Sequence, residues 1–363
     1  DKVVQMDNII KGMNRPKELL SLKSSNSITI RDEDDNLKIF DLSNTRPMHD
    51  DEASALKNNT RNIIYGLPGK ESGKLSTHDV QKAKKSDGTT KAHNPTWSDI
   101  IYSPKISAGV IVPSLRRLNG RRVKPHYVFG NDDRQTFYPS GYPWQCIGRV
   151  FVWTDPSNPN WSWSGSAALV THNTILTAGH VAPWGANSWK VLFVPAYYNG
   201  SSTLGAGVLS YVESYWGYNT NDHVAAWDYC VMKLYDPLGD SLGWLGSKTY
   251  DGGWNDGNYW TLVGYPGAVA SAEQPSWQGG ISFHDDDEDG DAMELETDNG
   301  DSSPGDSGGP IFAWWDDGSP YIVGVISGEE EEYQFPFSSQ DNNIAAAGSP
   351  MVDLINWAWS NWP

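Results

Sequence analysis

A hexapeptide near the C-terminal end of the chain, Gly305-Asp306-Ser307-Gly308-Gly309-Pro310, carries residue types suited to nucleophilic chemistry. A nucleophilic serine needs a hydroxyl on a tight turn and backbone N–H groups aimed at the position where an oxyanion forms. Gly305 allows the backbone to direct its N–H, together with that of Ser307, toward one point. The hexapeptide therefore predicts Ser307 as a nucleophile and the amides of Gly305 and Ser307 as an oxyanion hole.

Two other segments offer the groups that activate such a serine. His180 ends the sequence Thr-Ala-Gly-His after the strand-like AALVTHNTIL, and Asp228 precedes the strand-like YCVMKL. Asp228 would accept the Nδ1–H of His180 and stabilise the imidazolium. Taken alone, the histidine would more often be an ordinary residue and the aspartate a turn residue. Combined with the serine motif, they predict a Ser-His-Asp triad and two-step acyl transfer.

The order of these residues distinguishes between folds that share this triad. Gly-Asp-Ser-Gly-Gly also fits the nucleophile elbow of α/β-hydrolases, in which the histidine follows the serine. The last histidine of this chain is His284, so none follows Ser307. The order His180, Asp228, Ser307 excludes the α/β-hydrolase fold and is the order found in chymotrypsin.

The elements around these residues are short and rich in β-branched and aromatic residues. From Val128 onward, apolar segments such as IGRVFVW, KVLFVPAYY and YIVGVIS alternate with Gly, Pro, Asn and Asp clusters. This spacing is typical of an all-β sandwich or barrel. Cys230, Met232 and Leu234 alternate with Tyr229, Val231 and Lys233, which predicts a half-buried strand directly after Asp228. Val352, Ile355 and Trp359 follow a helical period near the C-terminus. We expect two six-stranded antiparallel barrels and a closing helix.

The charge distribution divides the chain near Tyr127. Residues 1–127 hold 22 of the 27 Lys and Arg but only 15 of the 45 Asp and Glu, whereas the remainder holds 5 and 30. We expect residues 1–127 to be a basic, partly disordered prosegment, attracted to the acidic domain of residues 128–363 that it covers. A basic disordered tail is the alternative.

The acidic domain would repel nucleic acid, and no apolar run approaches the roughly 18 residues of a membrane span. We expect a monomer acting on protein or peptide substrates.

Three local features complete the sequence-based expectations. The dibasic pairs Arg116-Arg117 and Arg121-Arg122 resemble processing sites in an exposed linker. Cys146 and Cys230 are too few for a disulfide framework, and their pairing stays open. Residues 285–296 match the D-x-D-x-D-G-x5-E calcium pattern, but their flanks predict strands and a turn rather than two helices. We favour an acidic hairpin without a specific ion, and expect no metal and no cofactor.

TAGHV, DYCVMKL and GDSGGP resemble the three catalytic blocks of the trypsin-like serine endopeptidases, and the chain is most similar to their glutamyl endopeptidase branch. The likeness covers nearly everything after Tyr127, with VFGNDDRQ and YPWQCIG similar to the mature start and WQGGISF to a strand before the nucleophile. It implies the chymotrypsin-like double barrel and the roles of His180, Asp228, Ser307 and the Gly305 amide. With the prosegment, it implies a secreted, extracellular zymogen.

The specificity pocket departs from that branch. Glutamyl-specific members usually have a histidine where this chain has Val325-Ile326-Ser327-Gly328. Asp301 lies where trypsin-type enzymes hold an aspartate for basic substrates, although glutamyl endopeptidases often have one there too. We expect Asp301, Ser302, Ser327 and Gly328 to line the pocket. The acidic run Glu329-Glu332 favours basic substrates slightly, although a solvated charge run is the more frequent case. The preferred cleavage residue is not determined.

Asp306 matches the trypsin type rather than the Asn or Gln common in the glutamyl branch. In trypsin-like zymogens this aspartate pairs with a new N-terminal amine after cleavage. We expect an amine at or near Val128 to play that part. The family's disulfide at the catalytic histidine is missing, since Val181 follows His180 directly. A catalytically silent binding protein of the same fold and an intracellular quality-control protease are the alternatives.

Overall fold

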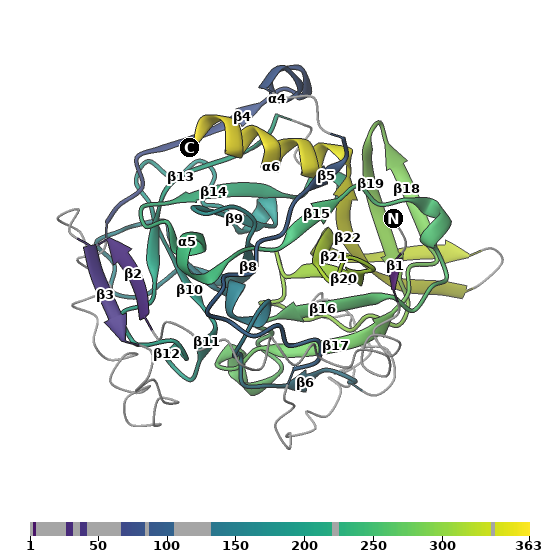
Figure 1. Ribbon diagram of the computed structural model, residues 1–363. Helices are drawn as coiled ribbons and strands as arrows, with labels where there is room; N and C mark the ends of the chain where they lie inside the picture. The colour runs from purple at the N-terminus through teal and green to yellow at the C-terminus, as the bar shows by residue number, and fades with distance from the viewer. Residues whose placement is uncertain are drawn as a thin grey trace, which may run out of the picture.

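The computed structural model describes residues 67–83, 87–104, 132–219, 225–334 and 338–363, and the backbone of the short strands β1 (Val3–Val4), β2 (Ser27–Arg31) and β3 (Leu37–Asp41). For residues 329–334 and 338–341 it describes the backbone alone. Figure 1 shows a body built mainly of strands, with one long helix across its face near the C-terminus.

The first half is a closed barrel of six antiparallel strands. Its order is β10-β7-β8-β9-β14-β13, and β13 pairs back onto β10. Every residue of β7 is buried. The strands are β7 (Ile147–Trp153), β8 (Trp163–Leu169), β9 (Thr174–Thr177), β10 (Lys190–Pro195), β13 (Ser210–Tyr218) and β14 (Cys230–Leu234). This barrel confirms the first of the two that the sequence predicts.

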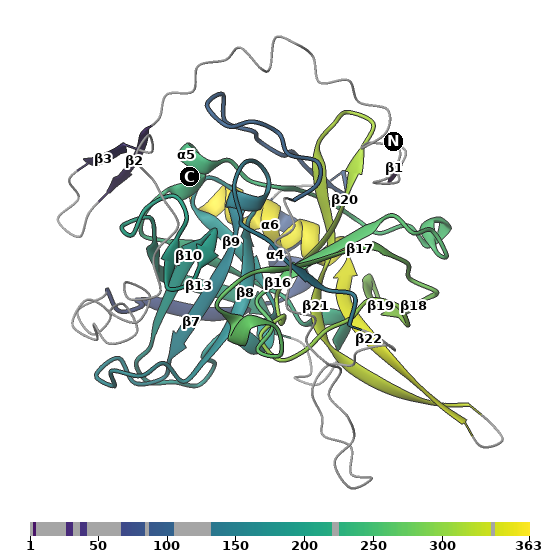
Figure 2. The same cartoon turned by 90° about the horizontal axis from the view of Figure 1, so that it is seen from below.

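The second half is a longer sheet with the order β18-β19-β22-β21-β20-β16-β17-β6. β15 and β5 are attached at β21, and β1 pairs with β20. Figure 2 shows the long β21–β22 hairpin projecting away from the body. The all-β class is confirmed, but this sheet has more strands than the expected six. Its members are β6 (Gln135–Thr136), β16 (Trp260–Gly264), β17 (Ser276–Ile281), β18 (Asp285–Asp289), β19 (Ala292–Thr297), β20 (Pro310–Trp315), β21 (Pro320–Gln334), β22 (Ser338–Gly348), β5 (Thr89–Thr90) and β15 (Gly246–Lys248).

The short elements connect and cover these sheets. The α-helices among the described residues are α4 (Thr77–Ala83), α5 (Leu238–Leu242) and α6 (Ser349–Asn361). The 3-10 turns within the same ranges are η3 (Trp144–Cys146), η4 (Gly179–Val181), η5 (Ala225–Trp227), η6 (Gly252–Trp254) and η7 (Ala270–Ala272). Two further strands, β11 (Tyr197–Tyr198) and β12 (Ser201–Ser202), form a small hairpin.

Helix α6 confirms the predicted closing helix. Val352 and Ile355 are fully buried in the largest hydrophobic cluster, and Trp359 packs against Trp244 and His172. Strand β14 departs from prediction, because Val231 is as buried as its neighbours Cys230 and Met232. Helix α6 covers this part of the barrel from outside, so apolar residues are favoured on both faces of the strand.

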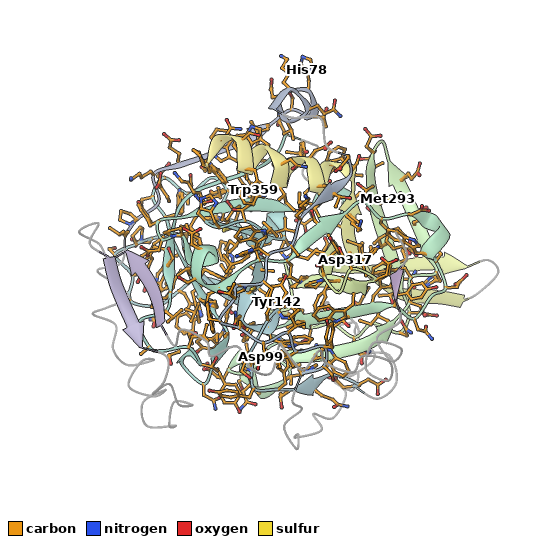
Figure 3. The ribbon with its side chains drawn as sticks, in the orientation of Figure 1. His78, Asp99, Tyr142, Met293, Asp317 and Trp359 are labelled. Atoms are coloured by element: carbon orange, nitrogen blue, oxygen red, sulfur yellow. The ribbon has the colours of Figure 1, made fainter. Side chains whose placement is uncertain are left out.

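Residues 67–83 and 87–104, which we call the N-terminal belt, pack on both halves. Strand β4 (Glu71–Leu75) adds to the barrel parallel to β13, and β5 pairs with β15 of the second sheet. The side chain of Val80 in α4 is 1% exposed and joins the main core. The Tyr142 N–H donates to the Asp99 carbonyl at 3.0 Å, and Figure 3 labels both residues. The polar composition did not predict strand β4 and helix α4, which pack on the domain, whereas residues 87–104 consist mainly of loops and turns, as expected.

Both cysteines are free and buried, and the Cys146 thiol donates to the Leu242 carbonyl at 3.3 Å. Burial raises the pKa of both thiols well above their ordinary value.

We expect neither cysteine to react with a thiol reagent in the folded protein and both to react after denaturation. Reductant should leave the melting temperature unchanged, and a fall on reduction would show that they pair.

Candidate active site

His180 lies in the turn η4, which follows the last residue of β9. Its backbone N–H donates to Asp228 Oδ1 at 2.8 Å, and its ring Nδ1 lies 2.6 Å from Asp228 Oδ2. An ionised carboxylate only accepts, so Nδ1 is the protonated nitrogen and Nε2 is left to act as a base. The imidazole is 47% exposed, so substrate can reach it.

Asp228 follows the turn η5 and is held by both halves of the molecule. Besides the two donors of His180, the Ser327 hydroxyl of β21 donates to Asp228 Oδ2 at 2.6 Å. Gly179 leaves space for this carboxylate, because a Cβ there would lie 3.0 Å from Asp228 Oδ1. The aspartate thus orients the imidazole and is itself oriented by three donors.

Ser307 is packed against the strand end that carries His180. The Ser166 N–H of β8 donates to the Ser307 carbonyl at 2.9 Å. Gly308 has φ of 81°, and a Cβ there would lie 2.0 Å from Thr177 Oγ1 and 2.6 Å from Ala178 N. Because Thr177 and Ala178 directly precede Gly179 and His180, the nucleophile turn and the histidine turn are neighbours. The sequence prediction that these distant segments meet agrees with this packing.

Gly305 adopts the left-handed backbone conformation that its place in the motif suggests, with φ of 106°. Its carbonyl accepts a hydrogen bond from the Ser166 hydroxyl at 2.7 Å, and the same hydroxyl accepts the Tyr265 N–H at 2.9 Å. A Cβ on Gly305 would lie 2.3 Å from the Tyr265 carbonyl. Ser166 therefore fixes the peptide that follows Gly305, a role that no local sequence signal indicates.

Asp306 is fully buried, and Arg134 donates to its Oδ2 at 2.8 Å. Burial raises the pKa of Asp306 to about 6, although the charge of Arg134 opposes this shift. Val128, near which we expect a partner amine, lies outside the described residues. The structure therefore does not test that pairing, and it reveals a cationic partner that sequence reasoning missed.

The four expected pocket residues differ in their surroundings. Asp301 and Ser302 are buried, and Asp301 Oδ2 accepts the Asp133 N–H at 2.8 Å. Ser302 Oγ is buried with no hydrogen-bond partner among the described residues. A Cβ at Gly328 would meet nothing within 4 Å, consistent with an open wall. Ser327 directs its hydroxyl to Asp228, so its side chain helps to orient that carboxylate.

The acidic segment forms the hairpin that its flanks predict. β18 pairs with β19, with Asp285 opposite Glu296, and Asp289 Oδ2 accepts the indole N–H of Trp227 at 2.8 Å. The strands and turn are confirmed and differ from the two helices of an EF-hand. The described residues contain no group of three or more His, Cys, Asp or Glu placed to hold a metal ion.

The pair of His180 and Asp228 changes the protonation of both groups. Partial removal of the ring from water disfavours the imidazolium, but the hydrogen bond and charge of Asp228 outweigh this effect, and the pKa of His180 is raised above its ordinary value. Burial would raise the pKa of Asp228, but the donors His180 and Ser327 lower it overall. The pair thus favours an ionised carboxylate beside a basic imidazole.

The Trypsin family model matches residues 143–336, more than half of the chain. This protein therefore belongs to the Trypsin family and is a serine endopeptidase.

The chain is also similar to one curated protein and to one solved structure. It is 22% identical over 215 residues to the "Extracellular metalloprotease" of Bacillus subtilis (strain 168), a match that covers 56% of this chain and 66% of that relative. The structure of a Glu endopeptidase in complex with MPD superposes with a TM-score of 0.50 at 20% identity, covering 64% of this chain and 99% of the other. This likeness confirms the chymotrypsin-like fold.

We expect the raised pKa of His180 to appear in the pH dependence of activity. Only the neutral imidazole can accept the serine proton, so kcat/KM should rise with pH through a midpoint above about 6.5, the ordinary pKa of histidine. Asp228→Asn should lower this midpoint and reduce kcat by about 10⁴-fold, because the tautomer and the charge are lost. A wild-type midpoint below 6.5 would contradict the assignment.

Proposed function

We propose that the chain hydrolyses peptide bonds through a triad of Ser307, His180 and Asp228. The observation that carries the proposal is the hydrogen bond between the His180 imidazole and the partly buried carboxylate of Asp228. This pair lies at the strand end against which the Gly308 turn packs. His180 Nε2 takes the Ser307 hydroxyl proton as the oxygen attacks the substrate carbonyl. The amides of Gly305 and Ser307 stabilise the oxyanion, and His180 then protonates the leaving amine. Water hydrolyses the acyl-enzyme by the same route.

The triad predicts that an organophosphonate serine probe labels the active enzyme at Ser307. We expect Ser307→Ala to remove labelling and to lower kcat by at least about 10⁴-fold, since removal of the nucleophile leaves only binding and the oxyanion hole. Ser157→Ala, in an exposed turn, is the matched control and should behave as wild type. Unlabelled wild type that binds peptides without cleaving them would favour a catalytically silent binding protein instead.

The pocket assignment is part of the proposal and leaves the preferred residue open. Asp301, Ser302, Ser327 and Gly328 are proposed to line the pocket for the side chain on the acyl side of the cleaved bond. Asp301 supports a preference for basic substrates because its carboxylate is buried, where an opposite charge is strongly favoured. Cleavage of a peptide library by the processed enzyme distinguishes basic, acidic and other preferences.

We further propose that the protein is secreted as a zymogen and activated by cleavage between residues 116 and 128. The dibasic pairs and the match to an extracellular relative support this. No helix within the described ranges is long and apolar enough to cross a membrane.

Cleavage there would leave the N-terminal belt docked on the domain. Gly69 and Lys70 donate backbone hydrogen bonds to Trp189 and Glu213 at 3.0 and 2.7 Å, and β4 continues the sheet beside β13. We expect the purified active enzyme to contain two chains, seen by intact mass, that separate only in denaturant. Val80→Asp should release the shorter chain, because it buries a charge at a 1% exposed position. A stable active enzyme holding the catalytic chain alone would contradict this expectation.

A further inference from the structure

Arg134 occupies a buried position between the start of the second sheet and the nucleophile turn. It directly precedes β6, which pairs with β17, so its backbone is fixed by the sheet. Its side chain is 1% exposed. A buried arginine is costly unless its donors are satisfied, so its partners define its role.

Those partners are two carboxylates and a hydroxyl. Asp132 accepts from Nε at 2.9 Å and from Nη2 at 2.7 Å, a two-point contact that fixes the plane of the guanidinium. Nη1 is then aimed at the nucleophile turn, donating to Asp306 Oδ2 at 2.8 Å and to Ser303 Oγ at 2.9 Å. Asp132 thus orients the cation, and the cation holds residues 303 and 306.

This contact acts on the peptides that would bind the oxyanion. Asp306 lies between Gly305 and Ser307, whose amides form the proposed hole. Its Oδ2 also accepts the Ser303 N–H at 3.0 Å, and the Asp306 N–H donates to the Ser303 carbonyl at 3.0 Å. The turn is therefore closed on itself around one carboxylate oxygen, and Arg134 supplies the positive charge at that oxygen.

We infer that Arg134 is a positioning residue for the oxyanion hole, and that the charge compensating Asp306 comes from this side chain rather than from a new chain-terminal amine. The inference rests on the proposed function of the Ser307 turn. Asp306 Oδ1 has no hydrogen-bond partner among the described residues, and Gly264 packs closely over it, since a Cβ there would lie 2.3 Å away. Because Oδ1 is closely packed, Oδ2 is the oxygen that anchors the turn. Arg134 already donates a hydrogen bond to Oδ2.

The first arm of the test removes the cation. Arg134→Met should reduce kcat by about 10²-fold or more with KM changed less than about threefold, because a misplaced oxyanion donor affects the transition state more than substrate binding. The double variant Arg134→Met with Asp306→Asn removes the unpaired charge from the Ser307 turn itself, leaving only Asp132 without the guanidinium, and should recover at least about tenfold in kcat over the single variant. Arg149→Met is the matched control: this buried arginine of β7 pairs at 3.3 Å with Glu273, which follows η7, so its loss should lower the melting temperature while kcat is retained.

The second arm changes the chain terminus. A processed enzyme made with one extra glycine before its natural first residue should keep kcat within about twofold, because no amine is needed at Asp306. Wild-type kcat in Arg134→Met, no recovery in the double variant, or loss of activity on extension would each overturn the inference. Failure of wild type to label at Ser307 would instead refute the proposed function itself.

Discussion

The carboxylate of Asp228 is the contact on which the arrangement of the two halves depends. This carboxylate is only 16% exposed, so it must be matched by donors, because a charge largely removed from water is costly when it is unpaired. Two of its donors come from His180 in the first barrel, and the third is Ser327 in the second sheet. Satisfying this one group therefore fixes the imidazole and the relative position of β14 and β21 together.

The turn that carries Ser307 is also held by hydrogen bonds from both halves of the molecule, but here the bonded groups are neutral. Ser166 in the first barrel binds the carbonyls of Gly305 and Ser307, through its hydroxyl and its N–H respectively, while Gly308 donates to the Ile326 carbonyl of the second sheet at 2.8 Å. The turn is thus held from both sides, and its close approach to Thr177 requires glycine at position 308. Gly308 therefore serves the contact between the two halves.

The sequence predicted the all-β class, the closing helix, the acidic hairpin and the meeting of the histidine and serine turns, because these depend on local periodicity and on a dense motif. It did not predict the hydrogen bond from Ser327 to Asp228, since a serine beside a predicted pocket gives no indication of which neighbour its hydroxyl faces. Arg134 and Ser166 were missed because each acts on residues more than 130 positions away. The sequence predicted that the prosegment covers the domain but not that it adds strands to it, because β4 and β5 form by pairing with β13 and β15 rather than from their own composition.

The most direct measurement is a crystal structure of the processed enzyme covalently modified by an organophosphonate. The account predicts phosphorus bonded to Ser307 Oγ, a phosphoryl oxygen within hydrogen-bonding distance of the Gly305 and Ser307 amides, and His180 still bound to Asp228. Modification of a different residue, or an imidazole turned away from both Ser307 and Asp228, would contradict it.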